Sequence, residues 1–162
     1  MGDRTDLILQ YFRYLVSDYD FIVVKKEFSP SMMGNAFVVF ASSKIGIEVV
    51  IDRDQVLIAM GDQSAPRDKW FDFSYAYQYF SNSTEQGYIF PKKTKDNTWD
   101  EIVEIQLRRL ADLLRQYCDP LLKGDLSMQG KIEELAQNYS KNLLEHLRQI
   151  AIKSQNNKAI NQ

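Results

Sequence analysis

The chain has 162 residues, of which 44% are hydrophobic and 26% are charged, a composition typical of one globular domain. Its net charge of −2 argues against a nucleic-acid partner, which requires a basic surface to displace counterions from phosphates. The single cysteine excludes an intramolecular disulfide, and the absence of a long apolar run argues against a membrane partner. Because the first residues do not resemble a signal peptide, the expected location is cytoplasmic.

The first forty residues predict a helix followed by a sheet. Residues 5–18 place apolar side chains at helical spacing, including Ile8, Phe12 and Leu15. The β-branched run at 21–24 opens the sheet, and Pro30 ends that strand because proline cannot donate to a ladder. Three further apolar runs follow, at 33–40, 45–51 and 56–60, with short polar turns between them. This spacing predicts a four-stranded antiparallel meander.

The turn Asp52-Arg53-Asp54 predicts a hairpin, since apolar and polar residues alternate on both sides of it. The alternation places six apolar residues on one face of the sheet, packed against helices: Ile47, Val49, Ile51, Val56, Ile58 and Met60.

The aromatic segment from Trp70 to Phe80 fits two periods. Phe71, Phe73 and every second residue to Tyr79 alternate as in a strand, whereas Trp70, Phe73, Tyr77 and Phe80 share one face of a helix. Asp72 is a suitable cap for the helix, so we expect a short aromatic helix.

The C-terminal part predicts two amphipathic helices. Thr98 and Glu101 form a capping box, and an apolar stripe follows to Leu121. After the turn at 123–125, a second stripe runs from Ile132 to Ile150, so we expect a helical hairpin packed on the sheet. Residues 1–153 are therefore expected to form a single α+β domain, and residues 154–162 a disordered polar tail.

The sequence contains no pattern of catalytic or metal-ligating residues. His146 is the only histidine and Cys118 the only cysteine, and each lies on or beside an apolar stripe, so we assign neither to catalysis. Asp52 and Asp54 lack the glycine and glutamate of a calcium loop. We therefore expect no catalytic residue, no metal and no cofactor.

A binding hypothesis rests on two exposed-looking segments. Tyrosine and tryptophan favour interfaces, so the candidate binding residues are Trp70, Tyr75 and Tyr79, together with the turn Asp52-Arg53-Asp54. The alternative is that Trp70 and Phe73 seal the sheet and that Arg53 pairs with its neighbouring aspartates.

Residues 33–80 resemble a group of small uncharacterised bacterial α+β proteins of the immunity type, which neutralise toxins. The resemblance is carried by Gly34-Asn35, Ser42, Ile47, Asp52-Arg53 with Gln55, and Trp70-Phe71-Asp72. It implies an α+β domain with a protein partner.

These observations leave three hypotheses for function. The first is a non-enzymatic protein-binding module, such as an immunity or adaptor protein. The second is an enzyme with an atypical carboxylate site, and the third is a homo-oligomeric protein, for example a homodimer through the C-terminal helices.

Overall fold

A computed structural model describes residues 2–160 of the chain. The elements in order are α1 (Arg4–Tyr19), β1 (Ile22–Ser29), a 3-10 turn (Pro30–Met32), β2 (Asn35–Ala41), β3 (Ile45–Asp52), β4 (Gln55–Asp62), a 3-10 turn (Arg67–Lys69), β5 (Phe71–Asp72), α2 (Phe73–Ser81), α3 (Trp99–Tyr117), α4 (Asp119–Leu122) and α5 (Gln129–Ile160). Mixed α+β architecture is thus confirmed.

The sheet is an antiparallel meander in the order β1-β2-β3-β4-β5. The prediction of four strands is wrong by one, because β5 pairs Asp72 with Ala59 and Phe71 with Met60. Two residues are too few to show an alternating pattern, so the sequence gives no sign of this strand.

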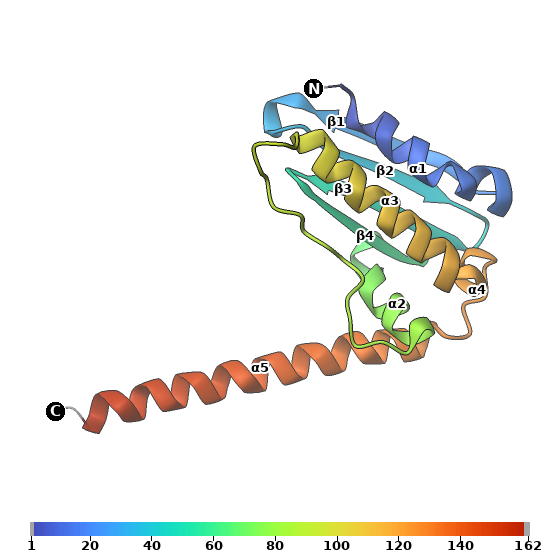
Figure 1. Cartoon of the computed structure of the whole chain (residues 1–162). Helices are drawn as coiled ribbons and strands as arrows, with labels where there is room; N and C mark the ends of the chain where they lie inside the picture. Colours follow the sequence, from blue (N-terminus) through green and yellow to red (C-terminus); the bar gives the residue numbers. More distant parts are fainter. Residues whose placement is uncertain (1, 161–162) are drawn as a thin grey trace.

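Two helices cover one face of the sheet. In Figure 1, α1 and α3 lie side by side on the same side of the strands, and α1 packs on β1 and β2 while α3 packs on β4. All six residues predicted for the inner face are buried, which confirms the alternation around the hairpin. The capping box of Thr98 and Glu101 begins α3 as expected.

The aromatic segment is helical from Phe73, with the Asp72 carboxylate accepting the Ser74 N–H. Phe73 and Tyr77 are buried on one side of α2, whereas Phe71 belongs to β5. The helical alternative is therefore correct from Phe73 onward, and the strand alternative holds only for Phe71 and Asp72, the two residues that precede α2.

The expected helical hairpin is wrong in its second half. α5 packs on α2 and β5 at its beginning and then projects away from the body as a single helix (Figure 1). Because α1 and α3 already cover the inner face of the sheet, no apolar area is left there for α5. The helix continues through residues 154–160 of the expected tail, and residues 161–162 lie outside the described residues.

Side chains occupy the free edge of β4 beyond its short pairing with β5. The Gln106 amide oxygen accepts the Val56 N–H at 3.1 Å, and the Tyr88 hydroxyl accepts the Ile58 N–H at 3.1 Å. The opposite edge strand, β1, has a bulge between Val23 and Lys25 and carries two lysines, features that discourage pairing with another strand.

None of the helices in the described part of the chain combines the length and apolar content needed to cross a membrane.

Candidate functional site

The structure separates the predicted binding residues into three places. Asp52, Arg53 and Asp54 form the turn at one end of the β3–β4 hairpin, whereas Trp70 lies beside Gly46 and Gly61, at the other end. Tyr75 and Tyr79 belong to α2 and face α5. The six residues therefore do not form one site.

Tyr75 and Tyr79 hold the beginning of α5 against the body. The ring of Tyr75 lies 6.3 Å from that of Tyr139, and the Tyr79 hydroxyl donates to the Met128 sulfur at 2.9 Å. Both are partly buried in the core, so their area is used within the chain.

Trp70 seals one end of the sheet, on the face opposite to α1 and α3. A Cβ atom at Gly46 would lie 2.2 Å from the Trp70 ring, and one at Gly61 would lie 2.8 Å from it. The indole N–H donates to the Asp62 carbonyl at 3.0 Å. The two glycines thus make room for the ring, which supports the packing alternative for Trp70.

The same face is otherwise open, since among the described residues no helix lies over it. A row of apolar side chains crosses it, because Phe37 pairs with Val50 and Val50 pairs with Leu57. Lys25 and Arg67 extend over the Phe37 ring, and Arg67 forms an ion pair with Glu48.

Two hollows lie on this open face, one toward each end of the hairpin. A hollow of about 760 Å³ adjoins Trp70 and is lined by Ile22, Val24, Val39 and Pro66, among others. A second hollow, of about 490 Å³, is lined by Met32, Met33, Phe37, Val50 and Arg53, among others. We call the second one the methionine hollow. It brings the predicted turn together with Met32 and Met33, which the sequence did not identify.

Two residues of the methionine hollow have left-handed backbone conformations. The φ angle is 59° at Met33 and 61° at Arg53. Asp20 and Asn82 also have positive φ angles where they end helices, as Met33 does at the end of the 3-10 turn Pro30–Met32, but Asp and Asn belong to the residue types that tolerate this region. Methionine and arginine do not, so the methionine hollow contains the two unusual backbone positions among the described non-glycine residues.

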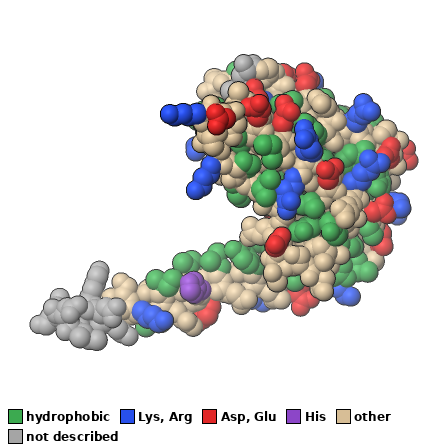
Figure 2. Space-filling view, in the orientation of Figure 1, with side chains coloured by type: hydrophobic (Ala, Val, Ile, Leu, Met, Phe, Trp, Pro, Cys, Tyr) green, Lys and Arg blue, Asp and Glu red, His purple; other side chains and the backbone are tan. Residues whose placement is uncertain are grey.

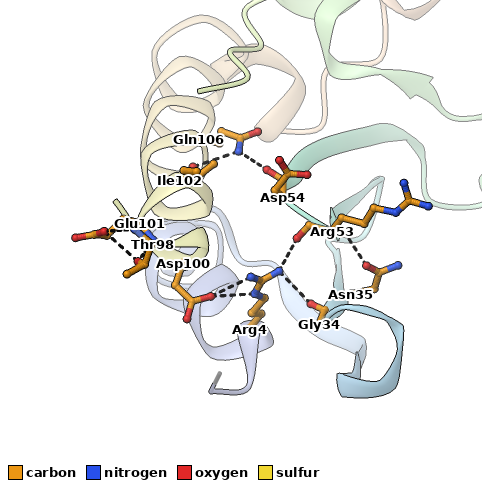
Figure 3. Close-up of polar contacts among 10 residues, drawn as sticks. All are labelled: Arg4, Gly34, Asn35, Arg53, Asp54, Thr98, Asp100, Glu101, Ile102 and Gln106. Carbon is orange, nitrogen blue, oxygen red and sulfur yellow. Dashed lines mark hydrogen bonds and ion pairs between the residues drawn. The ribbon is translucent and has the colours of Figure 1, made fainter. Parts of the chain in front are cut away.

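Buried side chains fix the backbone of the turn (Figure 3). The guanidinium of Arg4, which is 2% exposed, donates to the Arg53 carbonyl at 2.5 Å and to the Gly34 carbonyl at 3.4 Å. Its other nitrogens donate to the Asp100 carboxylate at 3.0 and 3.2 Å.

Further contacts fix both sides of the turn. The Gln106 amide donates to the Asp54 carbonyl at 2.5 Å, and the Asn35 side chain accepts the Arg53 N–H at 2.7 Å. The Asn35 amide also donates to the Asp52 carboxylate at 3.1 Å. The turn is therefore rigid, and two of its three predicted residues are held through their backbone.

The Arg53 side chain points away from these contacts in Figure 3. Within residues 2–160, no hydrogen bond or ion pair involves its guanidinium, although its backbone N–H and carbonyl are both used. The alternative in which Arg53 pairs with its neighbouring aspartates is therefore wrong.

Neither residue considered for catalysis lies in a reactive arrangement. Cys118 is fully buried, and burial raises the pKa of its thiol to about 12, so little reactive thiolate forms near neutral pH. His146 lies on the projecting part of α5, away from the body. Among the described residues, no three His, Cys, Asp or Glu side chains gather in a group that could hold a metal ion.

Met33, Arg4 and Gln106 were not predicted as parts of this site. Arg4 stands in the first turn of an amphipathic helix, where a basic side chain normally extends into solvent. Gln106 lies one residue before Leu107 of the apolar stripe, and only the folded position shows that its amide meets β4. Gly34 belongs to the sequence resemblance, but nothing in the sequence indicates that Met33 shares its left-handed conformation.

Comparison with the models of known families gives no match, and comparisons with curated proteins and with solved structures give no significant match.

Proposed function

We propose that the protein is a non-enzymatic protein-binding module and that its binding site is the methionine hollow with the adjoining open face of the sheet. The observation that carries the proposal is that Met33 and Arg53 both keep left-handed backbones and both line the same hollow.

A left-handed conformation disfavours a residue with a Cβ atom by about 1–2 kcal/mol, a penalty that glycine avoids. Strained positions of this kind cluster where the side chain serves binding or catalysis. Met33 is 67% exposed, and Arg53 is also exposed, so neither side chain contributes much to packing. A role in binding explains why these residues stand where glycine would be more stable.

The chemistry of the hollow suits a protein segment with an apolar side chain beside a carboxylate. Met32 and Met33 are flexible and polarisable, so they adapt to the shape of an apolar group, and Phe37 with Val50 provides an apolar floor. The Arg53 guanidinium presents a planar set of donors that matches a carboxylate.

The finer version of the proposal is an immunity or adaptor protein acting in the cytoplasm. Its support is the sequence resemblance over residues 33–80, which includes the Asp52-Arg53 turn. In this version the first partner to test is the protein encoded beside this chain.

The test uses Arg53→Gly and Met33→Gly. We expect each variant to raise the free energy of unfolding by about 0.5–1 kcal/mol, because relief of the backbone strain exceeds the added entropy of the unfolded chain. We expect the same variants to weaken partner binding by at least about tenfold, as loss of an interface anchor does. Partners are found by co-purification and co-expression, and each is then titrated by calorimetry.

Arg13→Ala serves as the control, since Arg13 is exposed on α1, on the other side of the sheet. It should leave the affinity unchanged. If partners bind the two glycine variants as tightly as they bind the wild type, the site lies elsewhere and the proposal fails.

A further inference from the structure

The centre of the open face of the sheet holds apolar side chains that are covered although α1 and α3 lie on the other side. Val39 belongs to the open face, because its neighbours Val38 and Phe40 are part of the core on the opposite side. Nevertheless, Val39 is only 5% exposed. Phe37, two residues earlier on the same face, is partly buried. Something other than a helix therefore covers these two side chains.

The cover consists of charged side chains from separate elements. Lys25 of β1 and Glu48 of β3 lie directly opposite Val39 in the sheet, one on each side of it. Arg67 extends over the sheet from the 3-10 turn after β4, and its guanidinium forms an ion pair with Glu48. The Lys25 ammonium lies 5.0 Å from the centroid of the Phe37 ring, and the Arg67 guanidinium lies 5.8 Å from it. We call Lys25, Glu48 and Arg67 the clasp.

The clasp lies between the two hollows of the open face. Lys25 and Arg67 line the hollow beside Trp70, and so does Val39. Phe37, which the two cations cover, lines the methionine hollow. The two apolar side chains under the clasp thus belong to different hollows. Without the clasp, a continuous apolar surface would join the hollows.

The arrangement of charge at the clasp differs from that on the rest of the visible surface. On the face of the body that Figure 2 shows, positive and negative side chains are intermixed, and apolar side chains are visible between them. At the clasp, two cations share one aromatic ring, and the Glu48 carboxylate offsets their repulsion. Long charged side chains also cover apolar surface with their methylene groups, which accounts for the burial of Val39.

The clasp can open without a change in the backbone. Hydrogen bonds fix its 3-10 turn, since the Trp70 N–H donates to the Arg67 carbonyl at 3.1 Å and the Lys69 N–H donates to the Pro66 carbonyl at 2.9 Å. The side chain of Arg67 is 43% exposed, and that of Glu48 is 22% exposed. An ion pair exposed to this extent is weak, and exposed side chains change rotamer within nanoseconds. Opening therefore requires only the rotation of side chains.

We propose that the clasp is an autoinhibitory contact, which closes the centre of the open face in the free protein and opens when a partner docks. This inference rests on the proposed function, because the clasp regulates the same site. Once the clasp has opened, Phe37 and Val39 join the two hollows into a single groove for the apolar part of the partner. The apparent affinity for the partner is then the intrinsic affinity multiplied by the fraction of molecules in which the clasp is open.

The first experiment needs no partner and uses the full chain. It titrates Nile red, an uncharged dye whose fluorescence rises in apolar surroundings. Arg67→Ala removes the clasp and should raise the affinity for the dye by about twofold to fivefold, the range that the loss of an exposed ion pair allows. Glu48→Gln leaves Arg67 without its ion pair and should raise the affinity in the same way. Lys69→Ala is the matched control, because Lys69 is an exposed cation of the same 3-10 turn but is not part of the clasp.

Salt provides an independent test of the clasp. Raising the sodium chloride concentration from about 0.02 to 0.5 M screens an exposed ion pair, so the affinity of the wild type for the dye should approach that of Arg67→Ala. Equal affinity for the dye in the wild type, Arg67→Ala and Glu48→Gln overturns the proposal. A rise in Lys69→Ala as large as that in Arg67→Ala overturns it as well, because the effect would then come from surface charge in general.

The second experiment separates this inference from the proposed function. Calorimetric titration with a partner found by co-purification or co-expression should show tighter binding to Arg67→Ala, again by about twofold to fivefold, whereas Met33→Gly and Arg53→Gly bind more weakly. Weaker binding to Arg67→Ala would mean that Arg67 contacts the partner instead of closing the site, and it overturns the inference. If Met33→Gly and Arg53→Gly keep the affinity of the wild type, the proposed function fails, while the dye titration still decides whether the clasp closes the face.

Discussion

At the scale of single residues, Arg4 joins three segments that are far apart in the sequence. Its guanidinium meets Asp100 at the beginning of α3, Gly34 before β2 and Arg53 in the turn. A lysine in its place has no planar set of donors that reaches all three.

We expect Arg4→Met to lower the free energy of unfolding by about 2–3 kcal/mol, because two backbone carbonyls lose their buried donor. Asp100 is partly exposed, so water can still solvate its carboxylate, and Asp100→Asn should have a smaller effect of about 1 kcal/mol. Urea unfolding of both variants measures the difference. Equal effects would show that the ion pair, and not the two carbonyls, accounts for the stability that Arg4 provides.

Buried acidic groups predict a loss of stability at alkaline pH. Burial raises the pKa of Cys118 to about 12, and burial also raises the pKa of Tyr14 and that of Tyr88. The folded chain keeps these protons where the unfolded chain loses them, beginning at the ordinary values of 9.0 for cysteine and 10.0 for tyrosine. The stability that these three groups contribute is therefore fully present well below pH 9 and is lost as the pH rises.

Urea midpoints between about pH 8 and 11 should show this decline, and Cys118→Ala should move its onset toward the tyrosine range. Tyrosinate absorbance should report Tyr14 and Tyr88 only as the chain unfolds. A midpoint that stays constant well above pH 10 would contradict the burial of these groups.

Local sequence patterns were sufficient to predict part of the candidate site. The two-residue hairpin and the exposure of Arg53 follow from local turn chemistry, and the sequence correctly placed the turn. The sequence could not decide between binding and packing for Trp70, because only the fold shows that Gly46 and Gly61 leave space for its ring. Met33 was not predicted, since a backbone angle imposed by the surrounding loop has no signature in the sequence.

At the scale of elements, α3 and α5 have similar apolar stripes but different roles. Leu114 is fully buried in the core, whereas Leu147 is exposed. We expect Leu114→Ala to lower the free energy of unfolding of the body by about 2–5 kcal/mol at any protein concentration.

Leu147→Ala should leave the midpoint of the body unchanged when unfolding is followed by Trp70 fluorescence in a Trp99→Phe background. Its effect should appear only in the helicity of the projecting part of α5. A clear loss of body stability on Leu147→Ala would mean that the projecting part of α5 folds back onto the body.

The elements themselves were largely predictable, because each has a strong local signal: the cap of α1, the capping box of α3 and the alternation around the hairpin. The packing of α5 was not predictable. Periodicity shows that a helix has an apolar face, but it does not show which surface covers that face.

At the scale of the whole molecule, the sequence predicted the class and the meander but not the shape. The body is a two-layer unit, and α5 extends from it by most of its length of about 48 Å at 1.5 Å per residue (Figure 1). The two layers are complete once α1 and α3 are placed, so the remaining helix has no inner surface to join.

The side chains on the edge of β4 have a consequence for biosynthesis. The strand ends at Asp62, whereas Tyr88 and Gln106 lie further along the chain. A nascent chain therefore presents β4 with bare N–H and carbonyl groups until these residues have left the ribosome. During that interval the growing sheet is open to intermolecular pairing and is a natural client for chaperones. Slow translation would therefore be most harmful to yield in the interval between the emergence of residue 62 from the ribosome and that of residue 106.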